Sequence, residues 1–223
     1  MTYPIFDPLA ATIDAITDEA PVPQERLTVH WLRARFSSPP SWAPENTDEL
    51  GQRQQQTNAN ARHASVLLPL VLREDGLHIL LTRRASHMHT HANQISLPGG
   101  RQEPSDASTV ETALREAQEE IGLHPRHVEI IGLLPEYWTN SGYRITPVVG
   151  LVKPPIVLQP NPEEVEEIFE VPLSFLMNGM NHQRRTAHFP NGSRTFYAMS
   201  FDRFFIWGVT ATILRNLFHF VRA

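Results

Sequence analysis

The stretch LREAQEEIG, residues 114–122, constrains this 223-residue chain more than any other, because it crowds three carboxylates into one short segment. Glu116, Glu119 and Glu120 would lie within about one and a half turns of a helix. Glu116 and Glu120 are i,i+4 neighbours, and like charges at that spacing oppose helix formation. The apolar residues nevertheless keep a helical period, at positions 110, 113, 114, 117 and 121. The pattern predicts a helix that packs one side and presents a carboxylate cluster on another.

Both ends of this helix carry their own sequence signals. Ser108 and Glu111 form an S-x-x-E capping box, which is typical of a helix start. Gly122 suits the left-handed position that follows many helices. We therefore expect the helix to lie between Ser108 and Gly122.

The carboxylate cluster has two interpretations. It is either a solvated acidic face, in which Arg115 softens the repulsion, or a site for a divalent cation. Mg²⁺ prefers oxygen ligands and often bridges protein carboxylates to substrate phosphates. The preceding segment SLPGGRQEPSD, residues 96–106, favours the second interpretation. Gly99 and Gly100 permit positive φ and close backbone approach, so the turn can offer N–H groups to phosphate oxygens.

The rest of the chain mixes strands with helices. Strand-like runs occupy residues 64–72 and 77–84 around the turn REDG, and further strands are expected at 127–135 and 145–152. A second helical segment, FFIWGVTATILRNLFHFV, covers residues 204–221. This mixture predicts an α/β layered domain over residues 62–223.

Residues 1–61 differ in composition and read as an N-terminal extension. Residues 1–60 are rich in Pro, Gln, Asn and Thr. The segments 12–20 and 25–36 could form short helices, and residues 37–62 read as a loop or mobile linker. The extension could cover the core, contribute to a homo-oligomer or stay mobile, and the sequence does not choose between these.

Composition excludes several classes of protein. Cysteine is absent, so we expect neither disulfides nor thiolate metal sites, as in a reducing compartment such as the cytoplasm. The first residues, MTYPIFDPLA, lack the features of a secretory signal, and no apolar run of about 18 residues predicts a membrane span. The net charge of −5 argues against nucleic-acid binding.

Residues 100–123 resemble the Nudix box, whose usual form is G-x5-E-x7-R-E-U-x-E-E-x-G-U, with U an apolar residue. The second half, Arg115 to Leu123, matches in full. The first half has Asp106 in place of glutamate and one additional residue. That insertion also occurs in the coenzyme A diphosphatase branch of the family, which this region resembles.

The upstream residues also resemble that branch, whose signature reads roughly L-L-T-x-R-S/A-x-x-L-R-x-H-x-G-Q-x-x-F-P-G-G. The matching positions are Leu80, Leu81, Thr82, Arg84, Ala85, His91, Gln94, Pro98, Gly99 and Gly100. The chain departs from the signature at Met88, His89, Asn93 and Leu97. Later stretches at 140–150, 163–173 and 206–214 look like the same branch, so the resemblance covers about residues 62–220.

The resemblance implies a Nudix fold, with a mixed β-sheet sandwiched between helices, and hydrolysis of a diphosphate with Mg²⁺ or Mn²⁺. Carried over by position, the metal ligands would be Glu116, Glu119 and Glu120. The catalytic residues would be Glu119, Glu120 and Glu164. The substrate-binding residues would be Arg83, Arg84, Gly99, Gly100 and Arg101. Arg115 would orient a box carboxylate.

The catalytic base is open at this point. The run PEEVEEIFEV, residues 162–171, offers Glu163, Glu164, Glu166 and Glu167, of which Glu164 aligns best with the branch. The other interpretation of this run is a solvated acidic turn before a helix.

Three functions fit the sequence. The first is hydrolysis of coenzyme A or its thioesters, giving 3′,5′-ADP and 4′-phosphopantetheine or its acyl form. The second is hydrolysis of another nucleoside diphosphate derivative, such as ADP-ribose or a dinucleotide. The third is a non-catalytic Nudix-fold module.

His87, His89 and His91 alternate as zinc ligands can, but only His91 matches the family pattern. Trp207 could stack a base, although core packing is the simpler role.

Overall fold

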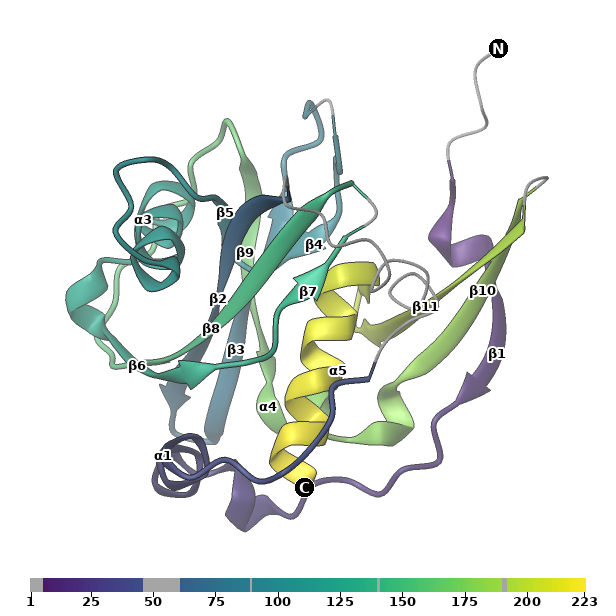
Figure 1. The fold of residues 1–223 in the computed structure, drawn as a ribbon, viewed down its shortest axis with the longest axis horizontal. Coiled ribbons are helices and arrows are strands. Elements are labelled where there is room, and N and C mark those ends of the chain that lie inside the picture. Colours follow the sequence, from purple (N-terminus) through teal and green to yellow (C-terminus); the bar gives the residue numbers. More distant parts are fainter. Residues whose placement is uncertain (1–5, 46–60, 89, 140, 190–191) are drawn as a thin grey trace.

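The computed structural model describes residues 6–45, 61–88, 90–139, 141–189 and 192–223. These residues form two β-sheets and four α-helices, with helix α5 lying between the sheets (Figure 1). The larger sheet has the central order β4-β3-β2-β8-β6, and its additional strands β5, β7 and β9 pair with β2, β8 and β3. Helix α3 lies on the other side of this sheet from α5 (Figure 1). The expected mixed sheet between helices is confirmed.

The larger sheet is built from strands β2 to β9. Their bounds are β2 Arg62–Arg73, β3 Gly76–Arg84, β4 Ile95–Ser96, β5 Gly99–Arg101, β6 Val128–Leu133, β7 Tyr137–Trp138, β8 Tyr143–Val152 and β9 Val165–Pro172. The smaller sheet has the order β1-β10-β11-β12. Its bounds are β1 Thr12–Ile16, β10 Gln183–Phe189, β11 Gly192–Phe201 and β12 Phe204–Trp207.

The helices connect and cover these sheets. The α-helices are α1 Val29–Ser37, α3 Thr109–Ile121, α4 Leu173–Leu176 and α5 Gly208–Arg222. The 3₁₀-helices are η1 Pro8–Ala10, η2 Gln24–Leu27, η3 Pro125–His127 and η4 Gly179–Asn181. Among the described helices, none combines the length and the apolar character needed to cross a bilayer.

The central strand β2 shows why its sequence is apolar without alternation. Leu67 and Val71 pack in the core beneath α3, whereas Leu68 and Leu70 pack in the core beneath α5. A strand buried on both faces reads as a continuous hydrophobic run. β2 also runs parallel to β8, in unbroken register from Arg62 to Val71.

Most of the predicted elements are confirmed. The two runs around REDG form the antiparallel hairpin β2–β3, with Arg73 opposite Gly76. The strands expected at 127–135 and 145–152 are β6 and β8, and the helix expected at 25–36 corresponds to η2 and α1. The helix between Ser108 and Gly122 is α3.

Two helix predictions were wrong in part. Residues 12–16 form the edge strand β1, because they pair with β10, a partner about 170 residues later that local sequence cannot reveal. Residues 204–207 form β12, which pairs with β11, and α5 begins only at Gly208. Phe204, Phe205 and Trp207 belong to the aromatic residues that favour strands. The acidic turn at 163–164 is likewise followed by a strand, β9.

The N-terminal segment is tied to α5 by a cluster of charged groups. Arg215 on α5 is buried; it forms an ion pair with Glu19, and its Nε lies 2.8 Å from Oε2 of Glu45. His219 also lies 2.6 Å from that oxygen, and the Tyr197 hydroxyl donates to the same carboxylate. Residues 46–60, which make up much of the predicted linker, lie outside the described residues. The boundary at residue 61 stays a prediction.

His182 is a buried histidine whose surroundings favour its neutral form. Its Nε2 lies 2.8 Å from the carbonyl oxygen of Leu176, and its Nδ1 lies 3.1 Å from Nη1 of Arg215. These partners indicate that Nε2–H donates to Leu176 and that Nδ1 accepts from Arg215. Burial is the main reason that the pKa of His182 is lowered to about 4; the Leu176 carbonyl opposes this change, and the charge of Arg215 contributes to it.

We predict that His182 makes stability depend on pH between about 6.5 and 4.5. In this range the unfolded chain binds a proton that the folded protein excludes, so the free energy of unfolding falls as the pH falls. The expected loss is about 2 kcal/mol. Urea unfolding of wild type and His182→Gln at pH 7 and 4.5 measures it, because Gln does not titrate. An equal loss in both proteins would contradict the assignment. Glu45 affects a lower range, below pH 4.5, since its pKa is lowered to about 2.

Candidate active site

The turn Gly99–Gly100 lies directly against α3, and at Gly99 the neighbouring backbone leaves no space for a side chain. Gly99 has φ of 153°, and a Cβ on it would lie 2.3 Å from the carbonyl oxygen of Ser65. A Cβ on Gly100 would lie 2.6 Å from the carboxylate of Glu116. The N–H of Gly99 donates to Oε2 of Glu120 at 3.0 Å. The backbone of the turn makes the close approach expected of glycines and brings two box carboxylates against it. The Gly99 N–H, which was expected for a phosphate oxygen, is bonded to Glu120 instead.

The ends of α3 fix the direction in which these carboxylates point. At the start, Oγ of Ser108 accepts from the N–H of Glu111 at 3.1 Å. The Glu111 carboxylate accepts from the N–H of Ala107 at 2.7 Å, one residue earlier than in the usual capping box. At the end, Gly122 has φ of 69°, and its N–H donates to the carbonyl of Gln118. Both predicted helix ends are confirmed.

Glu120 is the most perturbed carboxyl group of the cluster. Its residue is only 3% exposed, and Nη1 of Arg84 lies 3.9 Å from its Oε1. The pKa of Glu120 is raised to about 8, mainly by burial. The charges of Glu164 and Glu116 contribute to this rise, while the Gly99 N–H and Arg84 oppose it. The ionised form of Glu120 is therefore unfavourable in free energy, and a nearby cation would stabilise it.

Glu116 experiences the same surroundings. Burial raises its pKa, Arg115 lowers it, and the charges of Glu119 and Glu164 raise it. Glu164 lies in the turn before β9, where its carbonyl accepts from the N–H of Ala85 at 2.8 Å. Thus the structure brings the charge of Glu164 to the two box carboxylates, although more than 40 residues separate them in the sequence.

Arg115 binds several of the acids at once. It forms a bidentate pair with Asp106, with Nε 2.9 Å from Oδ1 and Nη2 3.0 Å from Oδ2. Nη2 also lies 3.0 Å from Glu116, and Nη1 lies 2.8 Å from Glu119. The hydrogen bond from Arg115 lowers the pKa of Asp106 to about 2. Asp106, in place of the first box glutamate, therefore serves as a partner for Arg115, and the side chain of Glu119 remains 56% exposed.

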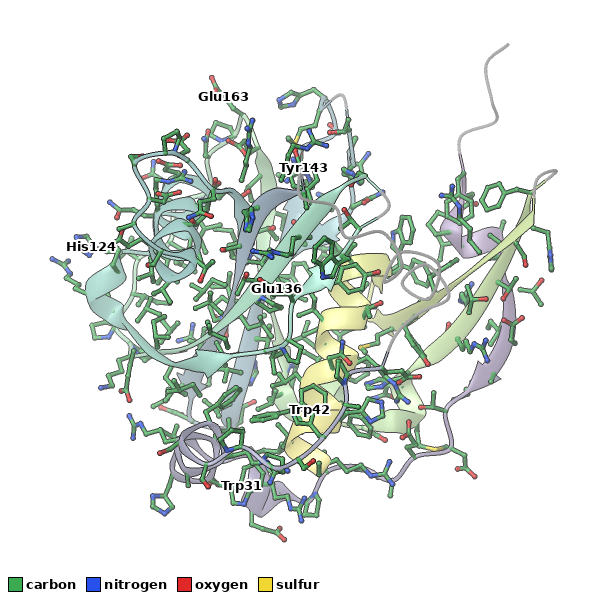
Figure 2. The ribbon with its side chains drawn as sticks, viewed as in Figure 1. Trp31, Trp42, His124, Glu136, Tyr143 and Glu163 are labelled. Carbon is green, nitrogen blue, oxygen red and sulfur yellow. The ribbon has the colours of Figure 1, made fainter. Side chains whose placement is uncertain are left out.

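The two adjacent arginines of β3 point in different directions. Arg84 faces α3 and Glu120, whereas Arg83 lies 3.3 Å from Glu167 on β9. Successive residues of a strand point to opposite faces, which accounts for the difference. Arg101 is exposed at the end of β5. Glu163, the neighbour of Glu164, projects outward from the turn before β9 (Figure 2).

The histidines of HMHTH are held by separate partners. His87 lies 3.2 Å from the carbonyl oxygen of Glu163, and Nδ1 of His91 lies 2.9 Å from Oε1 of Gln94. His89 lies outside the described residues. Within the described part of the chain, no three His, Cys, Asp or Glu side chains converge closely enough to enclose a metal ion.

The chemistry of the site nevertheless fits a divalent cation with oxygen ligands. The charge of Glu164 raises the pKa of both Glu116 and Glu120, and all three side chains offer hard oxygen donors. Two polar atoms beside them, Oγ of Ser65 and Nε of Arg84, are buried without a hydrogen-bond partner. Buried polar atoms are normally paired, so these two indicate a missing ligand or water. The sequence did not single out Ser65, because only the sheet register places it opposite Gly100.

Comparison with known proteins gives consistent matches. Residues 61–190 match the family described as the NUDIX domain. A protein of Yersinia enterocolitica serotype O:8, named uncharacterized Nudix hydrolase NudL, is 40% identical over 160 residues, covering 72% of this chain and 82% of that protein. The protein of the same name from Yersinia pestis (strain Pestoides F) is also 40% identical, over 72% and 80% of the two chains. A C. elegans Ap4A hydrolase structure is 16% identical with a TM-score of 0.44, covering 49% of this chain and 80% of the other.

Proposed function

The chain belongs to the Nudix hydrolase family, and from this premise we propose that it hydrolyses the diphosphate bond of coenzyme A or its thioesters. The products would be 3′,5′-ADP and 4′-phosphopantetheine or its acyl form. One observation supports the reaction class above all, namely the surroundings of buried Glu120. Its carboxylate accepts a hydrogen bond from the Gly99 N–H and lies beside Arg84. The charges of Glu116 and Glu164 also act on it. The named relatives are described as uncharacterized, so the substrate rests on the sequence signature and the site.

The carboxylates have separate roles in the proposed reaction. Glu116 and Glu120 would hold Mg²⁺ or Mn²⁺, and Glu119 is the third predicted ligand, which would have to leave Arg115. When bound, the cation would neutralise the diphosphate and lower the pKa of a water. Glu164 accepts the proton of the attacking water. The new bond joins the water oxygen to phosphorus, and the anhydride P–O bond breaks with its electrons leaving on the departing phosphate.

The cationic and backbone groups position the substrate. Arg84 binds a non-bridging phosphate oxygen, since its guanidinium faces Glu120 and its buried Nε lacks a partner. Gly99 donates to Glu120, so its N–H orients the carboxylate. Gly100 leaves space for Glu116. We also keep Arg83 and Arg101 as proposed phosphate contacts; Arg83 would have to leave Glu167.

Residues of the coenzyme A signature hydrogen-bond to the backbone of Arg84, and this supports the proposed substrate. The N–H of Arg84 donates to the carbonyl of Gln94 at 3.0 Å, and the N–H of Asn93 donates to the carbonyl of Arg84 at 3.2 Å. Asn93 has φ of 61°. The signature has glycine at this position, and asparagine is among the few other residues that tolerate this conformation. The departure at Asn93 therefore preserves the backbone of the loop.

We predict that coenzyme A is the preferred substrate by kcat/KM. Coenzyme A, dephospho-coenzyme A and ADP-ribose should be compared with Mg²⁺ and with Mn²⁺. The expected order places coenzyme A at least tenfold above ADP-ribose, because a site built for polar groups rejects substrates that lack them. A preference for ADP-ribose or a dinucleotide would assign the second function. Absence of turnover with every diphosphate would favour the non-catalytic module. A cytoplasmic location and a homo-oligomer stay predictions.

A further inference from the structure

The face of the larger sheet that carries the box also carries His63 and Arg144. Ser65 pairs with Gly100 on β5 and with Thr146 on β8. Two residues closer to the start of both strands, His63 on β2 pairs with Arg144 on β8. Side chains two residues apart on a strand share a face. His63 and Arg144 therefore lie on the α3 side of the sheet, beyond the position where Glu116 meets the turn.

The distance between the Gly100 turn and Arg144 on β8 suits a single nucleotide. Two strand spacings, ~10 Å, separate Gly100 from β8. The long side chain of Arg144 can cover part of this distance. The remaining span is on the scale of one ribose, between a diphosphate on its 5′ oxygen and a second substituent on its 3′ oxygen. The start of β8 and the turn before β9 both lie in the upper part of the view, as the positions of Tyr143 and Glu163 show (Figure 2).

The Arg144 guanidinium has neighbours that hold it in place, but not all of its N–H donors make hydrogen bonds. Nη2 lies 3.0 Å from Nδ1 of His63. Nε lies 3.3 Å from Oε1 of Glu136, but it is buried and makes no hydrogen bond. Its central carbon lies 5.7 Å from the ring of Trp138. Among the described residues, no group is hydrogen-bonded to Nη1. The side chain is 33% exposed, so an incoming ligand can reach it.

The chemistry of Arg144 favours an anionic ligand. Arg62 pairs with Tyr143 and Arg101 pairs with Ala64, so both point to the opposite face of the sheet from Arg144. Of these three arginines, Arg144 is the one on the α3 face. Glu136 is the acid paired with Arg144, and its side chain is 40% exposed, so water screens this pair. A guanidinium with a free donor edge matches a phosphate oxygen pair better than a neutral base.

We propose that Arg144, supported by His63, binds a phosphate monoester of the substrate, distinct from the diphosphate that is cleaved. This inference rests on the proposed function, because coenzyme A carries such a phosphate on the 3′ oxygen of its ribose. It supplies the cation for that phosphate in a chain whose signature has His89 instead of arginine. The subsite discriminates coenzyme A from dephospho-coenzyme A, which differ only in this group.

The test compares those two substrates in wild type and Arg144→Gln. The variant should lower kcat/KM for coenzyme A roughly 10- to 100-fold, as expected for loss of charge-assisted hydrogen bonds. Its kcat/KM for dephospho-coenzyme A should change less than about threefold. Arg144→Lys should recover part of the loss, since it restores the charge without the fork. Arg194→Gln, which removes an exposed arginine from β11, is the matched control and should leave both values unchanged.

A binding measurement separates this inference from the proposed function. Calorimetry with 3′,5′-ADP and AMP reports the phosphate subsite whether or not coenzyme A is hydrolysed. Wild type should bind 3′,5′-ADP at least tenfold more tightly than AMP, and Arg144→Gln should lose the difference. Equal losses on both substrates, or equal affinities of wild type for both nucleotides, would overturn the subsite. Retained discrimination without coenzyme A turnover would overturn only the proposed substrate. Melting temperatures of the variants identify any loss that comes from misfolding.

Discussion

Glu120→Gln is expected to lower kcat by about three orders of magnitude while leaving the fold intact. Glu120 is buried, accepts the Gly99 N–H and lies beside Arg84. Loss of one charged ligand removes several kcal/mol of charge stabilisation from the transition state, and each 1.36 kcal/mol is a factor of ten in rate. Gln has nearly the same shape, so packing at the turn should not change.

The same substitution should raise the stability of the metal-free protein. Burial and the charges of Glu164 and Glu116 all disfavour a charge on Glu120. A neutral side chain removes that penalty, so the melting temperature without metal should increase. Opposite changes in activity and stability are typical of functional residues, which are retained although they destabilise the fold. A structural carboxylate would show a loss of both.

The measurement needs kcat with Mg²⁺ and Mn²⁺ and melting curves with and without metal. Glu74→Gln makes the same chemical change in the exposed β2–β3 turn and should alter kcat less than twofold. Metal should stabilise wild type by mass action, and this shift should shrink in Glu120→Gln. A variant that keeps more than a tenth of wild-type kcat would show that Glu120 is not a principal metal ligand.

The sequence predicted α3 well because the information is local. The spacing of Glu116 and Glu120, the cap at Ser108 and the end at Gly122 all lie within fifteen residues. The close contact with the glycine turn also followed from residue type, since only glycine permits it. These are the parts of the site in which one helix and the preceding turn determine the geometry.

The remaining parts depend on pairings between distant segments. Sequence could not decide which of Arg83 and Arg84 faces the box, because this depends on the face of β3 that α3 covers. The proposed role of Arg144 depends on the register of β8 with β2, which places it opposite His63. Edge strand β1 was expected as a helix, since its partner β10 is far along the chain. Register and long-range pairing, rather than propensity, limited the prediction.

The second large effect concerns stability, and its residue is Arg215. Its buried guanidinium contacts Glu19 and Glu45 of the N-terminal segment. Burial alone would raise the pKa of Glu45, but hydrogen bonds from His219 and Tyr197 and the charge of Arg215 lower it to about 2. Arg215→Met would leave two partly buried carboxylates without their main cation. We expect a loss of about 3–5 kcal/mol in the free energy of unfolding at pH 7.

A matched exposed pair separates burial from charge. Arg33 makes a bidentate pair with Glu129, with N···O distances of 2.7 and 2.8 Å, but both side chains are more than a third exposed. Exposed pairs contribute little, so Arg33→Met should destabilise the protein far less than Arg215→Met. Adding Glu45→Gln to Arg215→Met should recover part of the loss, because the penalty arises from an unpaired charge. Urea unfolding of wild type, Arg33→Met, Arg215→Met and the Arg215→Met/Glu45→Gln double variant tests this explanation. Equal losses for Arg215→Met and Arg33→Met would show that the N-terminal segment is held by apolar contacts instead.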